Sequence, residues 1–163
     1  MVLNFPIILL ASLIPLVVGF VWYNNNIFGK AWMEASGMNE DKIKGGNMAL
    51  IFGLSFVLAF LLAFSLNFAV IHQNHLHSLF MGQEDALKDV LAYLDANHGQ
   101  WTTNFRGFSH GLNHGFTAGL LMITPALATN ALFERKSFKY IAINCGYWLL
   151  STALMGGVIC QFS

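Results

Sequence analysis

The residues best suited to chemistry in this chain are its six histidines, all of which lie between His72 and His114. His72 and His75 are three residues apart, and His110 and His114 are four apart. Residues at either spacing share one face of a helix, with their side chains close together. Neutral imidazole binds Zn, Cu, Fe or haem through a ring nitrogen. The spacing therefore predicts two histidine pairs that could form one site for a metal ion or a haem.

A purely structural role for the same histidines is the alternative. No acidic residue adjoins either pair, and no H-E-x-x-H motif is present to complete a metalloenzyme site. Neutral imidazoles at a membrane surface can also bond to one another, to water or to lipid headgroups. The sequence leaves both interpretations open, a metal or haem site and a hydrogen-bonded cluster that joins two helices.

The elements that must position these histidines are long apolar segments. Of the 163 residues, 56% are hydrophobic and only 10% charged, whereas a soluble domain has about 25% charged residues. A membrane-spanning helix needs about 20 apolar residues, and β-barrel strands are shorter and alternate in polarity. We therefore predict an all-α integral membrane protein, a single domain over residues 1–163, with a bundle of four transmembrane helices at about 5–23, 48–71, 111–132 and 138–160.

The loops indicate how these helices are oriented. Lys and Arg gather on the cytoplasmic side of membrane proteins, and six of the eight follow the first and third helices, against Lys88 and Arg106 on the other side. We expect the first and third loops to be cytoplasmic, and both termini and the histidine-rich segment to face the periplasm or the cell exterior. The first helix lacks the basic flank of a signal peptide, so we expect it to be retained. Side chains expected to anchor the helices at the interface are Trp22, Tyr23, Lys30, Trp32, Arg135 and Lys136.

An extramembrane insert is predicted between the second and third helices, at about residues 78–106. The second helix can extend past the membrane as far as Met81, and Gly82 is a plausible stop. Beyond it, leucines and a valine recur at helical spacing among acidic residues, which is the pattern of an amphipathic surface helix. The apolar positions of this helix are Leu87, Val90, Leu91 and Leu94.

The third apolar segment has two different faces. Gly111, Gly115 and Gly119 follow the small-xxx-small pattern that lets membrane helices approach closely. Polar residues gather on the opposite side, namely Ser109, His110, Asn113, His114 and Thr117. The two cysteines, Cys145 and Cys160, are about 22 Å apart along the fourth helix, so we expect packing residues and no disulfide within the chain.

Several short motifs are similar to those of a known family. They are Gly19–Tyr23 with Ile27–Met33, and Asn130–Arg135 with Ile143–Trp148 and Leu154–Gly157. Over nearly its whole length the chain resembles the domain of unknown function 1761 family of bacterial membrane proteins. The resemblance implies a small four-helix inner-membrane protein. It implies no activity, cofactor or catalytic residue.

Three functions are compatible with these features. The first is a non-enzymatic membrane component, either a homo-oligomer or an accessory subunit of a larger complex, supported by the glycine stripe and by the lack of a recognisable catalytic set. The second is a metal- or haem-binding redox protein that uses His72, His75, His110 and His114. The third is a small-solute transporter or channel. The net charge of zero gives no reason to expect a nucleic-acid partner.

Overall fold

The computed structural model describes residues 3–98 and 103–163, and these residues are helical with no β-strand. The predicted all-α class is therefore confirmed. Four helical stretches of the described chain are long and apolar enough to cross a membrane. Their bounds agree closely with the sequence prediction: Phe5–Trp22, Met48–Val70, Phe108–Phe133 and Phe138–Phe162.

The first of these stretches consists of two helices, α1 (Phe5–Ala11) and α2 (Ile14–Trp22). They meet at a turn over Ser12 and Leu13. Pro15 has no backbone N–H with which to continue the helical ladder, so the axis breaks just before it. The Asn4 side chain caps α1 by accepting a hydrogen bond from the Ile7 N–H.

The second stretch, α5 (Met48–Val70), ends earlier than a continuous helix to Met81 would. Ile71 is in an extended conformation and the next helix, α6 (Gln73–Leu79), starts after His72. Ile71 is fully buried in the core at this break. The expectation of an unbroken helix was therefore wrong, although Gly82, at φ +80°, does lie in a turn after α6.

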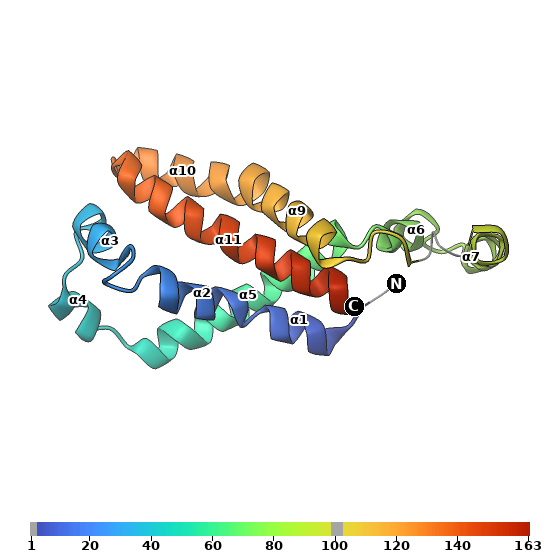
Figure 1. Cartoon of the computed structure of the whole chain (residues 1–163), viewed down its shortest axis with the longest axis horizontal. Coiled ribbons are helices and arrows are strands. Elements are labelled where there is room, and N and C mark those ends of the chain that lie inside the picture. Colours follow the sequence, from blue (N-terminus) through green and yellow to red (C-terminus); the bar gives the residue numbers. More distant parts are fainter. Residues whose placement is uncertain (1–2, 99–102) are drawn as a thin grey trace.

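The amphipathic segment forms α7 (Glu84–His98) beyond α6, at the end of the molecule (Figure 1). Its apolar positions are partly covered, whereas Glu84, Asp85, Asp89 and Asp95 are exposed. Residues 99–102 of the predicted insert lie outside the described residues.

The third stretch is α9 (Phe108–Ala118), a π-helical turn η1 (Gly119–Ile123) and α10 (Thr124–Phe133), which together run alongside α11 (Phe138–Phe162) (Figure 1). The π-helical turn ends two residues before Pro125, whose missing N–H disrupts the regular ladder. The glycine stripe faces α11. A Cβ atom on Gly111 or Gly115 would collide with the carbonyl oxygen of Gly156 or Thr152. These glycines therefore allow two helices of the same chain to pack backbone to backbone.

Two short helices, α3 (Gly29–Ser36) and α4 (Glu40–Lys44), connect α2 to α5. They lie at the same end of the molecule as the turn between α10 and α11 (Figure 1). Lys139 on α11 forms an ion pair with Glu34, and the Lys136 ammonium donates to the Ser36 carbonyl oxygen. At the opposite end, the Asn4 amide donates to the Phe162 carbonyl oxygen.

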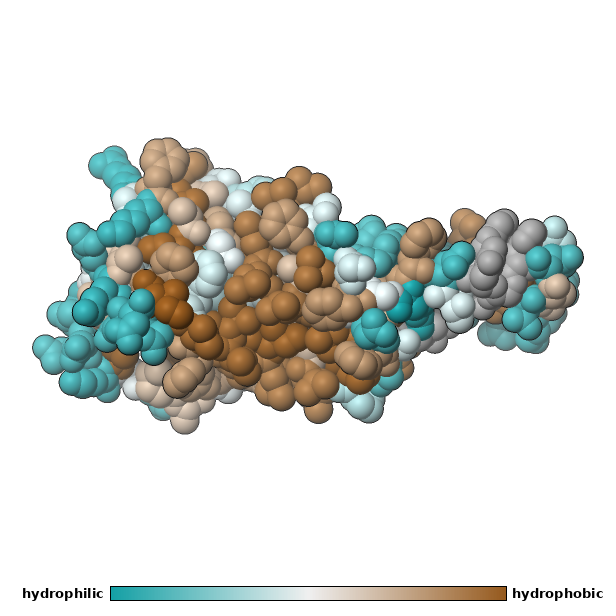
Figure 2. All heavy atoms as spheres, in the orientation of Figure 1, coloured by the Kyte–Doolittle hydropathy of each residue, from teal (hydrophilic) through white to brown (hydrophobic). Residues whose placement is uncertain are grey.

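The core is centred on α11, whose Met155 and Ile159 are fully buried against residues of α1 and α5. The outer surface is unusually apolar. Phe20, Leu121 and Phe133 are 83%, 66% and 87% exposed. Figure 2 shows an apolar band over the middle of the molecule with hydrophilic residues at both ends. The hydrophobic residues thus face outward as well as inward over the four long stretches.

Candidate metal centre

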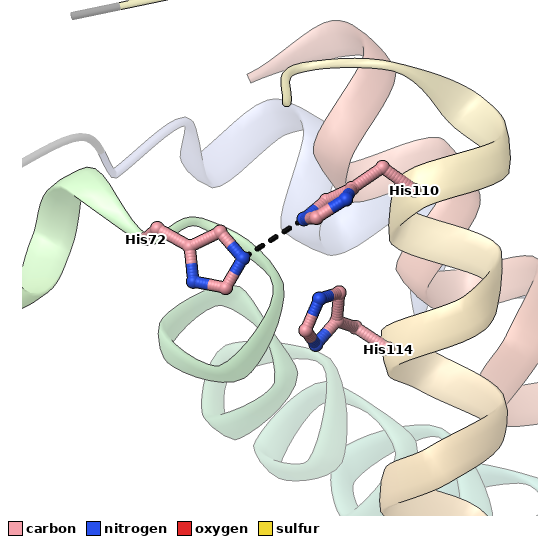
Figure 3. A group of neighbouring side chains, drawn as sticks. All are labelled: His72, His110 and His114. Atoms are coloured by element: carbon pink, nitrogen blue, oxygen red, sulfur yellow. Dashed lines mark hydrogen bonds between the residues drawn. The ribbon is translucent and has the colours of Figure 1, made fainter. Parts of the chain in front are cut away.

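Three histidines from two separate parts of the chain converge near the C-terminal end of α11. His72 lies at the break between α5 and α6, and His110 and His114 are one turn apart on α9 (Figure 3). The two helices that position these histidines, α5 and α9, both pack on α11. Helix α5 does so through its core residues and α9 through its glycines. The helix break at Ile71 and the glycine contacts therefore bring these three side chains together.

The three imidazoles are close enough to share one ion. One ring nitrogen from each lies within 4.8 Å of the others. The Nε2 atoms of His72 and His110 are 2.9 Å apart, a hydrogen bond in which one ring donates to the other. Nitrogens bound about 2.0 Å from a tetrahedral zinc ion are separated by roughly 3.3 Å, so side-chain movements of about 1–1.5 Å would bring all three to one ion.

His75, the fourth histidine of the predicted site, stands outside this group. Its side chain is exposed on α6, with its ring centroid 6.3 Å from that of His72. The break at Ile71 precedes both residues, so His75 still follows His72 by one helical turn, but His75 is not among the histidines whose ring nitrogens converge. His110 and His114 lie on an unbroken helix, with ring centroids 4.4 Å apart.

Phe105 is a neighbour of these histidines that the sequence analysis did not single out. Its ring lies 5.2 Å from that of His110, at an interplanar angle of 32°, and edge-on to His72. Its backbone has φ +62°, a left-handed conformation that costs a non-glycine residue roughly 1–2 kcal/mol. No sequence pattern indicates that conformation in a phenylalanine.

Hydrogen bonds on either side hold the Phe105 segment in place. The Cys160 thiol of α11 donates to the Phe105 carbonyl oxygen at 3.1 Å. The Gln73 amide donates to the Asn104 carbonyl oxygen at 3.0 Å, and Arg106 donates to the Ser163 carbonyl oxygen at 2.8 Å. Strained residues of this kind persist only where their surroundings over-determine them, and they cluster at functional sites.

A cavity of about 560 Å³ opens beside the histidines. Its lining combines two of the imidazoles with amide and apolar side chains: His72, Gln73, Leu76, Asn104, Phe105 and His110. An ion held by the three histidines would therefore have space and polar groups next to it for a further ligand.

The electrostatic environment favours neutral imidazole at His72. Burial lowers the pKa of His72 below its ordinary value, and the nearby His114 and His75 lower this pKa further. Both effects disfavour an additional positive charge at this position. The neutral form is also the one that coordinates a metal ion.

A haem fits this arrangement less well than a bare ion. Two axial imidazole nitrogens on one iron would lie roughly 4 Å apart, twice a metal–nitrogen bond of about 2 Å, with the macrocycle between the rings. The Nε2 atoms of His72 and His110 are in direct contact at 2.9 Å. The end of α5 and helix α9 would therefore have to move apart before a macrocycle could enter between the two rings.

Two of the three predicted interfacial aromatic residues contact α11 through their polar atoms. The Trp22 indole N–H donates to the Ile143 carbonyl oxygen at 3.1 Å, and the Tyr23 hydroxyl donates to the Asn144 side chain at 3.0 Å. Trp32 packs edge-on against Tyr23. Of the predicted anchoring cations, Lys30 and Arg135 are exposed and Lys136 lies over the Tyr140 ring. The aromatic residues thus join helices, a role that the sequence analysis did not assign to them.

The sequence matches a known protein family over almost all of its length. The family described as "Protein of unknown function (DUF1761)" matches residues 7–160. The chain belongs to this family. The DUF1761 match spans the histidine group, the glycine stripe and most of α11. No curated protein and no solved structure matches the chain significantly.

Proposed function

We propose that this DUF1761 protein is a multi-pass protein of the bacterial inner membrane that binds a transition-metal ion through His72, His110 and His114. The observation that carries the metal proposal is the convergence of three ring nitrogens within 4.8 Å of one another. Three histidines suit Zn, Cu, Ni or Fe, and a zinc site with three protein ligands leaves a fourth position open. The cavity beside His72 and His110 supports an open fourth position here.

Membrane insertion is supported by the four long apolar helices and by the apolar band between two polar ends (Figure 2). The proposed orientation follows from the cations. Lys30, Lys42 and Lys44 belong to the α3–α4 region, and Arg135, Lys136 and Lys139 to the α10–α11 turn at the same end. The positive-inside rule assigns that end to the cytoplasm. The metal site, the termini and α7 are then on the outer side.

We favour metal binding over a role as a homo-oligomer or accessory subunit, because the glycine stripe no longer indicates contact with another chain. The glycine stripe at Gly111, Gly115 and Gly119 packs on α11 of the same chain, so it does not require a partner. The strained Phe105 next to the histidines is a second observation in favour of a functional site.

The test is metal binding by tag-free protein in mild detergent, with elemental analysis followed by titration with Co²⁺ and competition with Zn²⁺. We expect one ion per chain and the visible absorption spectrum that is typical of Co²⁺ in a tetrahedral site. His72→Ala, His110→Ala and His114→Ala should each weaken binding by more than about 100-fold, exceeding the 10–100-fold loss caused by removing a residue that only supports a ligand.

His75→Ala is the matched control, because His75 is exposed and lies outside the group. It should leave the affinity within about twofold of the native protein. Failure of folded protein to bind any of Zn²⁺, Co²⁺, Cu²⁺ or Ni²⁺ would overturn the proposal and leave the histidines as a hydrogen-bonded joint between α5 and α9. Equal losses in His75→Ala and His72→Ala would also overturn it.

A further inference from the structure

We propose that a groove between α2 and α5, at the end of the molecule that carries α3 and α4, binds an anionic phospholipid. The inference rests on the membrane insertion proposed above and is independent of the metal site. The groove has a volume of about 700 Å³. That is within the range of roughly 300–1,000 Å³ that specific ligand sites occupy.

The groove exists because the two parts of the first apolar stretch pack differently on α5. In α1, Ile8 and Ala11 are fully buried in a core that includes Ala63 and Leu66 of α5. After the break before Pro15, α2 and the first half of α5 diverge, and both line the cavity (Figure 1). Tyr147 of α11 closes it from behind, with its hydroxyl donating to the Pro15 carbonyl oxygen.

The lining combines apolar and polar side chains. Hydrocarbon side chains of α2 and α5 form its walls, among them Leu16, Phe20, Ile51 and Phe52. The polar side chains lie where α2 ends and on α4, here called the polar end, and are Tyr23, Asn24, Asn25 and Lys42. Apolar side chains of the α3–α4 region, Trp32, Met33, Met38 and Ile43, line the groove beside them. An amphipathic occupant, with a hydrocarbon part and a polar part, suits this lining.

Lys42 gives the polar end a positive charge. It is the one charged residue among those that line the groove. Its ammonium donates to the Gly37 carbonyl oxygen at 3.0 Å, which leaves two of its three N–H donors for a ligand. The neighbouring Lys44 instead pairs with Glu40 and does not line the groove. The polar end is thus complementary to a phosphate.

The position of the groove, between two of the candidate membrane-spanning stretches, favours a lipid over other amphipathic anions. The walls belong to two of the membrane-spanning candidates, and Phe20 and Phe52 are 83% and 53% exposed on the molecular surface. The groove is therefore accessible from the side, at the depth where acyl chains lie. Its polar end lies at the proposed cytoplasmic face, where anionic headgroups attract basic side chains.

The experiment measures phosphatidylglycerol binding to the full-length protein in detergent, by native mass spectrometry, with phosphatidylcholine as the zwitterionic comparison. We expect one phosphatidylglycerol per chain bound in preference to phosphatidylcholine. Lys42→Gln should weaken phosphatidylglycerol binding about fivefold, the contribution typical of one basic residue at a membrane surface. Lys42→Arg should retain binding, and Lys44→Gln should match the native protein.

A second variant tests the hydrocarbon part of the groove. Ser55 lines it on α5, and Ser55→Phe adds a ring without changing the charge, so it should reduce binding of both lipids. Equal binding of the two lipids, or equal effects of Lys42→Gln and Lys44→Gln, would overturn the proposal. Binding of glycerol phosphate, which has no acyl chains, would also overturn it, because the site would then recognise a soluble phosphate. Zn²⁺ binding and membrane fractionation on the same samples report separately on the proposed function.

Discussion

Substitution of Gly115 by alanine tests the contact that connects the fold to the metal site. Gly115 lies in the middle of the glycine stripe of α9, where an added Cβ would meet the Thr152 carbonyl oxygen and the Ala153 Cα of α11. Both are backbone atoms, so no side-chain rotation can relieve the collision. The two helices must move apart instead.

The expected magnitude has two parts of opposite sign. Overpacking costs about 1–3 kcal/mol, and a collision with backbone belongs at the upper end of that range. Alanine is a better helix former than glycine by about 1 kcal/mol, so the net loss is roughly 2 kcal/mol. Gly53→Ala on α5 is the matched control, because among the described residues no atom outside its own helix backbone lies within 4 Å of its added Cβ. The two variants should therefore differ by about 3 kcal/mol in their free energies of unfolding.

Thermal unfolding in one detergent measures this difference. At roughly 2–4 °C per kcal/mol for a chain of this size, Gly115→Ala should melt about 6–12 °C below Gly53→Ala. Separation of α9 from α11 also displaces His110 and His114 relative to His72, so metal affinity should fall in Gly115→Ala alone. Identical melting temperatures for the two variants would refute the close packing of α9 on α11.

Three further predictions concern pH, an interhelical bond and orientation. Because the pKa of His72 is lowered on folding, the stability that this histidine contributes should be complete above about pH 6.5 and lost as the pH falls through the lowered pKa. Metal affinity should fall over the same pH range. Titrations between about pH 5 and 8 measure this, and a constant affinity would contradict it. Tyr23→Phe removes the bond to Asn144 and should lower the free energy of unfolding by about 0.6 kcal/mol, the average for such bonds between membrane helices; an unchanged melting curve would contradict a contribution from that bond. Asp95→Cys on α7 should react with an impermeant thiol reagent in intact spheroplasts, and labelling only after lysis would reverse the proposed orientation.

The long helices were predictable from the sequence because their determinants are local. Continuous apolar segments of sufficient length, bounded by polar turns, indicate helices of this kind whatever packs against them. The breaks within them were not predictable in the same way. The break after α5 places Ile71 in a core that also contains residues of α1 and α11, far away in the sequence.

The candidate site shows the same division. Spacing along one helix predicted correctly that His110 and His114 lie side by side, whereas the placement of His72 beside them, without His75, depends on how the end of α5 packs against α9. Phe105 and its left-handed backbone depend on bonds to Cys160 and the neighbouring segments. No local pattern in the sequence carries that information.

The sequence by itself thus determined the all-helical class, the four apolar stretches and the glycine face of α9, because helix formation and hydrophobicity depend on neighbouring residues. Only the tertiary structure decided that this face packs on α11, that three histidines converge, and that Trp22 and Tyr23 donate to α11. It also decided that α2 and α5 diverge around a groove. These features depend on which helices meet and at what distance, and that is set by side-chain packing between segments remote in the chain.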